Sequence, residues 1–184
     1  SKSQILAIIK DNKIQDKTSG AGEFEIITDK TPFYAEKGGQ VGDTGEAISD
    51  NGEIEILDTK SPYGGIFIHK ARIKSGEIST NSQITLNVDK SRREKIKRNH
   101  TATHLLHAAL REIIGIHVRQ SGSLVHPDYL RFDFTNLESL TNSMIKKIED
   151  KVNEYIRNNL EVEVCHTTYN KAIEDGALAF FDDK

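Results

Sequence analysis

The chain has 184 residues, 36% of them hydrophobic and 29% charged, which supplies a core for one large or two small domains and excludes a disordered chain. The net charge of −3 gives no global argument for nucleic acid, and the single cysteine, Cys165, excludes an internal disulfide and favours a reducing compartment. Because no apolar run approaches the roughly 20 residues that span a bilayer, and no signal-peptide layout opens the chain, we expect a cytoplasmic protein without a membrane partner.

Residues 1–89 have the pattern of a β-structure. Short runs rich in β-branched residues predict strands, and they read GEFEIITD, GEIEILDTK, GGIFIHKARI and SQITLNVDK. The segment Asp50-Asn51-Gly52 is a strong hairpin-turn signal. Several short strands joined by short turns favour a small β-barrel.

The pattern changes at residue 90, which we take as a domain or subdomain boundary. Residues 90–115 have helical periodicity, and Gly115 is the predicted stop. The segment GSLVHPDYLRFDF predicts one or two strands, because its apolar residues alternate with polar ones. Further elements are predicted as a helix over 143–158, a strand over 161–164 (EVEV) and a short helix over 168–175 closed by Gly176. The fold class is therefore α+β.

The predicted long helix carries three histidines within eight residues, His100, His104 and His107. On a helical wheel the three fall within about 60° of one another. The apolar stripe lies on the other side and consists of Ala102, Leu106, Ala109, Leu110 and Ile113. We therefore expect the histidines to face solvent or a cleft made with another element, and not the core.

The spacing of His100 and His104 places two imidazoles on adjacent turns of one helix face, within reach of one ion. Zinc takes such nitrogen ligands and needs four ligands in total. Zinc binding and a solvated histidine face both fit this spacing. A metalloprotease is disfavoured, because Thr101 occupies the position where that chemistry needs a glutamate.

Cys165 and His166 are the obvious candidates for a further ligand, but they are consecutive in a predicted strand. Their side chains should point to opposite faces, so at most one of them would reach the ion. For Cys165 we favour a buried, small hydrophobic residue over a ligand.

Three other segments have functional potential. The glycine-rich loop EKGGQVGDTG (36–45) matches no phosphate-binding fingerprint, and a tight turn is favoured. The basic run SRREKIKR (91–98) predicts a solvated helix face, yet it leads directly into His100 and would suit a polyanion such as RNA. In HVRQSGSLV (117–125), Gln120, Ser121 and Ser123 would line a small polar pocket or form an ordinary turn.

Taken together, the segments TPFYAEKGGQVGDTG, RNHTATHLLHAALREIIGIHVRQSGSLV, LRFDF and GALAFF resemble, in this order, the internal editing region of alanyl-tRNA synthetases. Free-standing alanyl-tRNA editing proteins and the editing domain of threonyl-tRNA synthetases are similar in the histidine part. The resemblance implies a small β-barrel over residues 1–89. It also implies an editing-type domain over residues 90–184, with a long helix packed on an antiparallel sheet.

The resemblance also implies a function. Alanyl-tRNA synthetases attach alanine to tRNA(Ala) using ATP, with Mg²⁺, in a charging domain that this sequence does not contain. Their editing domain hydrolyses the ester of tRNA(Ala) mischarged with serine or glycine. A second site is needed because a pocket for alanine cannot strongly reject a smaller side chain or one that merely adds a hydroxyl. The implied partners are tRNA(Ala) and mischarged aminoacyl-tRNA, and not DNA.

By the same resemblance, the motif positions carry specific roles. His100 and His104 match zinc ligands of the HxxxH motif, and His107 fits the pattern without being a ligand. Thr103 and Gln120 match catalytic positions of the editing pocket. The substrate-binding positions are Ser123 and, near the tRNA 3′ end, Gly38, Gly39 and Gln40.

The sequence departs from the family in one respect. The family completes its zinc site with a Cys-x-x-x-His motif downstream of the segment that matches GALAFF, and this sequence ends at Lys184, before that motif. We therefore expect a fragment with an incomplete Zn²⁺ site that does not edit by itself. The alternatives are a free-standing alanyl-tRNA editing hydrolase and a non-catalytic RNA-binding module.

Overall fold

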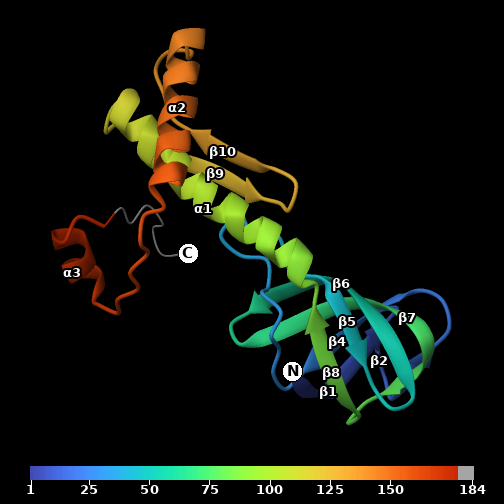
Figure 1. The fold of residues 1–184 in the computed structure, drawn as a ribbon. Coiled ribbons are helices and arrows are strands. Elements are labelled where there is room, and N and C mark those ends of the chain that lie inside the picture. The colour runs from blue at the N-terminus through green and yellow to red at the C-terminus, as the bar shows by residue number, and fades with distance from the viewer. Residues whose placement is uncertain (178–184) are drawn as a thin grey trace. The chain divides into compact units, whose positions relative to one another are not determined.

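The computed structural model describes residues 1–177, which divide into two compact units (Figure 1). The first unit comprises Ser1–His100 together with Leu124–Leu130. The second comprises Thr101–Ser123 and the chain from Arg131 onward. Each unit has its own cluster of buried apolar side chains. Strands joined by antiparallel pairings and separate packed helices confirm the predicted α+β class.

The first unit is an antiparallel sheet. Its strands are β1 (Lys2–Lys10), β2 (Lys13–Gln15), β3 (Lys17–Ser19), β4 (Glu23–Thr28), β5 (Gly45–Ile48), β6 (Gly52–Tyr63), β7 (Ile66–Ser79) and β8 (Gln83–Val88). They pair in the order β2-β1-β4-β7-β6-β5-β8, and β3 pairs with β7. Strand β8 also pairs back with β1, so the path of paired strands closes on itself. The four predicted runs are β4, β6, β7 and β8, while β1, β2, β3 and β5 lie outside them.

The predicted hairpin turn joins β5 to β6. The backbone N–H of Ser49 donates to the carbonyl of Gly52 at 2.9 Å, and Ile48 pairs with Glu53 beside it. The turn residues Asp50 and Asn51 are thus placed as the sequence predicts.

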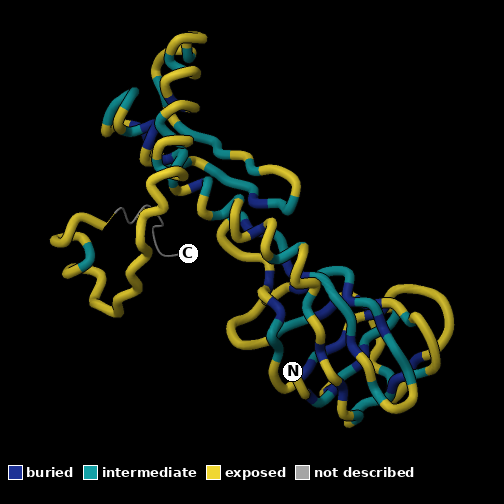
Figure 2. The backbone as a smooth tube through the Cα atoms, in the orientation of Figure 1, coloured by how far each residue is buried: buried dark blue, intermediate teal, exposed yellow. Residues whose placement is uncertain are grey.

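The buried positions of the first unit are spread over most of its strands, as the dark blue segments in Figure 2 show, and their side chains form one core cluster. On β6, Ile54 and Ile56 point inward with the two-residue period of a strand. On β1 the spacing is three, because a register shift between Ile5 and Ala7 lets both Ile5 and Ile8 face the core. The buried cluster consists of Ile5, Ile8, Phe24, Ile26, Phe33, Ala47, Ile54, Ile56, Ala71, Ile78, Ile84 and Leu86.

Helices dominate the rest of the chain. Helix α1 (Lys90–Ile113) is followed by β9 (Gln120–Val125), β10 (Leu130–Phe134), α2 (Asn142–Asn158) and α3 (Tyr169–Glu174). Strands β9 and β10 form a two-stranded sheet. These elements confirm both long predicted helices, the strands of GSLVHPDYLRFDF and the short helix. The predicted stop, Gly115, follows the end of α1 with a φ of 141°.

The core of the second unit joins both long helices to β10. Ala109 and Leu110 of α1 and Ile148 of α2 are buried, with Val118 between the elements. Phe132 and Phe134 of β10 and Val152 of α2 pack against them in part. Helix α2 begins where the Thr141 hydroxyl accepts a hydrogen bond from the Met144 N–H at 3.2 Å.

The predictions for the segment after α2 are wrong in two respects. Residues 161–164 (EVEV) alternate as a strand does, but they form none, because no strand of the described residues lies beside them to pair with. Cys165 is exposed, not buried, because residues 159–171 are exposed throughout. Most of GALAFF, from residue 178, lies outside the described residues. No helix within residues 1–177 is long and apolar enough to cross a membrane.

Candidate functional site

The two consecutive glycines of the loop 36–45 form the centre of a tight hairpin turn. Lys37 and Gln40 exchange two backbone hydrogen bonds, of 3.2 and 3.1 Å, across them. Gly38 and Gly39 have φ values of 60° and 83°, and two positive φ values in a two-residue loop define a type I′ turn. A tight turn is therefore confirmed, and a side chain at either glycine would strain the backbone.

The turn holds Gln40 in a buried position, where it meets two other segments of the first unit. The backbone of Gln40 forms a parallel bridge with Val125: the Val41 N–H donates to the Val125 carbonyl at 3.2 Å, and the Val125 N–H donates to the Gly39 carbonyl at 2.8 Å. The side chain of Gln40 reaches α1, where its Oε1 accepts from Nδ1 of His100 at 2.7 Å. Two predicted motifs, 60 residues apart in the sequence, are thus joined by one hydrogen bond.

A second contact fixes the same end of α1. The Asn99 amide donates from Nδ2 to the carbonyl of His126 at 2.7 Å, in the segment that links β9 to β10. Asn99 and His100 are therefore both anchored, one to Leu124–Leu130 and one to the glycine turn. This anchoring orients the His100 ring before any ligand is present.

The hydrogen bond from Nδ1 decides which nitrogen of His100 can act as a ligand. A neutral imidazole that donates from Nδ1 carries its lone pair on Nε2, and a carbonyl-type oxygen on Nδ1 is the usual second partner of a metal-binding histidine. His104 lies four residues further along α1 and is exposed. In residues 1–177 no group of three or more His, Cys, Asp or Glu gathers around a point where a metal could bind. The described residues therefore do not by themselves form a metal site, and zinc binding by His100 and His104 stays a prediction.

The remaining predicted site residues lie in the second unit. Thr103 is buried on α1. On β9, Gln120 donates from Nε2 to the hydroxyl of Ser123 at 3.2 Å, and both side chains are half-buried. These three side chains provide hydroxyl and amide groups that can bind another hydroxyl or a water molecule. Cys165 and His166 are exposed outside any strand, so the expected alternation of their side chains does not apply.

The prediction that all three histidines avoid the core is wrong for His107. Its side chain is buried, and its ring lies 5.1 Å from the ring of Phe132, centroid to centroid. Burial lowers the pKa of His107, and a hydrogen bond with the backbone of Val118 partly opposes this. The wheel failed here because β10 covers α1 with Phe132, which widens the buried face beyond the aliphatic stripe.

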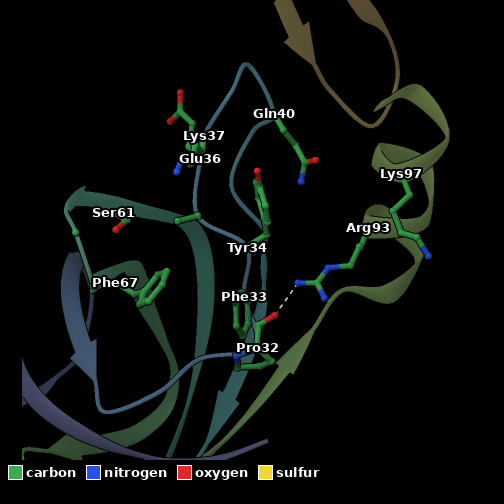
Figure 3. Close-up of a pocket in the computed structure, with 13 residues that line it drawn as sticks. Pro32, Phe33, Tyr34, Glu36, Lys37, Gln40, Ser61, Phe67, Arg93 and Lys97 are labelled. Atoms are coloured by element: carbon green, nitrogen blue, oxygen red, sulfur yellow. Dashed lines mark hydrogen bonds between the residues drawn. The ribbon is translucent and has the colours of Figure 1, made fainter. Parts of the chain in front are cut away.

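Part of the basic run of α1 is structural. Arg93 pairs with the buried carboxylate of Asp43. It also donates to the Pro32 carbonyl at 2.8 Å (Figure 3). Arg92 donates to the carbonyl of Gly42 at 2.8 Å. The expected solvated face is confirmed only for Lys95, Lys97 and Arg98, which are exposed. The two arginines attach the loop of residues 32–43 to the beginning of α1.

A pocket of about 910 Å³ lies beside this attachment, within the first unit. Figure 3 shows Ser61 and Phe67 on one side of Tyr34, with Arg93 and Lys97 of α1 on the other. Sequence reasoning missed this pocket. The adjacent Phe33 and Tyr34 in TPFYAEKGGQ could have indicated one aromatic wall of the pocket. No sequence pattern predicts that Phe67 of β7 lines the same pocket.

Comparison with known proteins identifies the family. Residues 1–92, half of the chain, match the family model described as tRNA synthetases class II (A). The chain is 44% identical to an alanine–tRNA ligase of Carboxydothermus hydrogenoformans over 98% of its own length. It is 45% identical over its full length to that of Thermoanaerobacter pseudethanolicus, and 44% identical over 98% of its length to that of Rickettsia felis.

In each case the chain spans 21% of the length of the relative. The family assignment thus rests on a match across the whole chain but on a limited part of each relative. The order of the motifs, the matched family model and these similarities agree. The chain belongs to the class II tRNA synthetases (A), the alanyl-tRNA synthetase family.

Proposed function

We propose that this chain is part of the editing region of a cytoplasmic alanine–tRNA ligase. The whole protein would attach alanine to tRNA(Ala) with ATP and Mg²⁺, and this region would serve the hydrolysis of tRNA(Ala) mischarged with serine or glycine. The hydrogen bond between Gln40 and His100 carries the proposal, because it unites the glycine turn with the histidine helix. The contact brings an amide oxygen and an imidazole from two motifs of the resemblance to one place.

The fold supports the same proposal. The circuit of paired strands that returns from β8 to β1 is the arrangement expected of the small β-barrel proposed for residues 1–89. The packing of α1 and α2 with β10 is that expected of an editing-type domain over residues 90–184.

His100 and His104 would provide two ligands of a zinc ion. The remaining ligands would come from the Cys-x-x-x-His motif that the family carries after the segment that matches GALAFF. When bound, zinc would polarise the ester carbonyl, lower the pKa of a water molecule or anchor the terminal adenosine. Gln40 would hold the His100 ring through Nδ1, so that Nε2 faces the ion.

Three polar side chains would handle the aminoacyl group. Thr103 and Gln120 would bind the seryl hydroxyl or orient the attacking water, and Ser123, which accepts the hydrogen bond from Gln120, would bind substrate. A hydroxyl bound in this way would favour the seryl ester over the alanyl ester, because a site built to hydrogen-bond a hydroxyl rejects an amino acid that lacks it. The glycyl ester would be admitted by its smaller size and not by this contact. The backbone of Gly38 and Gly39, with Gln40, would lie near the 3′ end of the tRNA.

Hydrolysis of Ser-tRNA(Ala) by the longer ligase that contains this region tests the proposal. We expect His104→Ala and Gln120→Ala to lower the rate by at least about 100-fold, the scale of a lost catalytic group. His117→Ala is the matched control, because this exposed histidine hydrogen-bonds to Asn136 and lies outside the HxxxH motif. Unchanged rates in both His104→Ala and Gln120→Ala would remove these residues from the mechanism.

The exposed cations Lys95, Lys97 and Arg98 favour a second candidate, a non-catalytic RNA-binding module. Binding of tRNA(Ala) to the chain in the absence of zinc, with no hydrolysis by the longer ligase either, would support the module. Hydrolysis that is lost in His104→Ala would support editing.

A further inference from the structure

The pocket of about 910 Å³ in the first unit has aromatic walls that stability does not explain. Phe33 is buried beneath it as part of the core. Tyr34, in contrast, keeps 41% of its surface exposed, and Phe67 is only half-buried. Partly exposed aromatic side chains in a concave site are typical of surfaces that bind a flat ligand.

Cations border the same pocket. Lys37 lies at the glycine turn, and Lys97 lies one helical turn beyond Arg93 on α1. Arg93 is committed to Asp43 and Pro32, so contact with an anion would fall to the two lysines. Lys97 pairs with Glu94 at 2.8 Å, but both side chains are more than half exposed, so this pair is weak and exchangeable.

One carboxylate lines the pocket among the described residues, that of Glu36. It lies 3.7 Å from Nζ of Lys60, which compensates its charge in part. In the part of the chain that the structure describes, Lys37 has no ion-pair partner. The pocket thus combines flat apolar walls with a positive border, and the complementary ligand is a flat ring attached to an anion.

We propose that this pocket binds an unpaired nucleotide of RNA, with its base on Tyr34 or Phe67 and its phosphate near Lys37 and Lys97. Base stacking on aromatic side chains beside a positive groove is how single-stranded nucleic acids are bound without strict sequence preference. A paired base cannot enter, because its faces are covered by its neighbours in the duplex. The identity of the polymer rests on the proposed function, since a tRNA is the RNA such a ligase would bind.

The backbone opposite Tyr34 is suited to close approach by a ligand. Gly64 and Gly65 line the pocket where β6 turns into β7. Nothing lies within 4 Å of the position that a Cβ would take at either glycine. A ribose or base edge can therefore reach the peptide groups of this turn without displacing a side chain.

Binding of a fluorescently labelled RNA tetranucleotide, ACCA, to the 184-residue chain tests the proposal by anisotropy. We expect Tyr34→Ala to weaken binding by about tenfold, the effect of one lost base–aromatic stack. Tyr34→Phe keeps the ring and should bind as the unchanged chain does. Lys37→Ala should weaken binding and reduce the slope of log K against log salt by about 0.7, as for one phosphate contact on a single strand.

Tyr169→Ala is the matched control, because Tyr169 is an exposed tyrosine of α3 that does not line the pocket. Amide chemical shifts locate the RNA independently of any variant: we expect changes at Lys37, Gly64 and Gly65. Unchanged affinity in Tyr34→Ala, or shift changes confined to other residues, would overturn the proposal. Equal binding of a blunt RNA duplex would do the same, and AMP binding as tightly as ACCA would replace RNA by a free nucleotide.

Measuring both ACCA binding and hydrolysis of Ser-tRNA(Ala) distinguishes failure of this proposal from failure of the proposed function. If His104→Ala abolishes hydrolysis by the longer ligase while Tyr34→Ala changes neither hydrolysis nor ACCA binding, editing stands and the nucleotide pocket does not. If ACCA binding depends on Tyr34 but the longer ligase hydrolyses no Ser-tRNA(Ala), the pocket stands and editing does not.

Discussion

The two units of this chain are stabilised in different ways. In the first, a closed circuit of antiparallel strands surrounds one cluster of twelve buried residues. In the described part of the second, four buried residues form the cluster, and the remaining contacts come from partly buried side chains. Within residues 1–177 the sheet of this unit has two strands, which is marginal without helices packed on it.

The difference bears on the candidate site. The glycine turn and His100 belong to the unit with the larger core, whereas Thr103, Gln120 and Ser123 belong to the unit with the smaller one. A rigid sheet suits the first group, because its proposed role is to hold the His100 ring and the 3′ end of the tRNA. The second group lies in the unit with the smaller described core, where we expect local opening to cost less free energy.

Truncation of one core isoleucine in each unit measures this contrast. We expect Ile54→Ala to lower the free energy of unfolding by about 4 kcal/mol, because Ile54 is fully buried among strands that cannot collapse around the cavity. Ile148→Ala, at 6% exposure on α2, should cost about 2 kcal/mol. Urea unfolding followed by hydrogen exchange of peptides from each unit resolves the two losses. If each variant lowered the protection of peptides from both units by the same amount, the two units would unfold together.

The buried histidine of the first unit gives its stability a pH dependence. His69 lies between the hydroxyls of Thr28 and Thr59, at 3.4 and 3.2 Å, and burial lowers its pKa to about 4. The unfolded chain, with a pKa near 6.5, binds the proton first, so stability is complete above pH 6.5 and falls as the pH decreases toward 4. The full loss is about 3 kcal/mol.

Unfolding free energies between pH 7 and 4.5 test this expectation. His69→Gln should remove most of the slope in this range, whereas His117→Gln, at an exposed position, should leave it unchanged. A slope in His69→Gln as steep as that of the unchanged chain would assign the pH dependence to other groups.

The ion pair between the basic run of α1 and the loop 32–43 should contribute less to the free energy of unfolding than the effect of His69 above. Asp43 is 1% exposed and Arg93 is 32% exposed, so removal of the arginine leaves a buried carboxylate that water can reach in part. We expect Arg93→Met to cost about 2 kcal/mol, below the 3–5 kcal/mol of a fully buried pair. Arg98→Met, at an exposed position, should change thermal stability by less than about 0.5 kcal/mol. A loss in Arg93→Met no larger than in Arg98→Met would contradict a structural role for the pair.

Local patterns predicted the elements that satisfy their own hydrogen bonds or pair with a sequence neighbour. The helix over 90–113, the helix over 142–158 and the turn at Asp50-Asn51-Gly52 are such elements. The same patterns failed where a distant partner decides. EVEV has the period of a strand, but none of the strands that the structure describes pairs with it. His107 lies on a helix face that Phe132 of β10 covers.

The candidate site shows the same limit. Motif resemblance selected Gln40 and His100, but their hydrogen bond depends on the pairing of the glycine turn with Val125, which no periodicity encodes. The pocket proposed to bind a nucleotide was still harder to predict from the sequence. Tyr34 lies in a loop and Phe67 on β7, and only the folded sheet brings them to one cavity.

Loss of a helix cap should give the smallest changes in unfolding free energy. The caps of α2 and α3 allow a packed helix to be compared with an unpacked one. The Thr141 hydroxyl caps α2, which buries Ile148, so Thr141→Ala should cost about 1 kcal/mol of unfolding free energy. The Thr168 hydroxyl caps α3 with the same geometry, accepting from the Lys171 N–H at 3.4 Å, but α3 buries no residue. Because a short helix without tertiary packing adds little to global stability, Thr168→Ala should change it by less than about 0.3 kcal/mol. Thermal unfolding of both variants distinguishes them, with Thr→Ser at each position as the control that keeps the cap. A loss from Thr168→Ala as large as that from Thr141→Ala would mean that α3 is packed in solution, against the exposed surface that it has here.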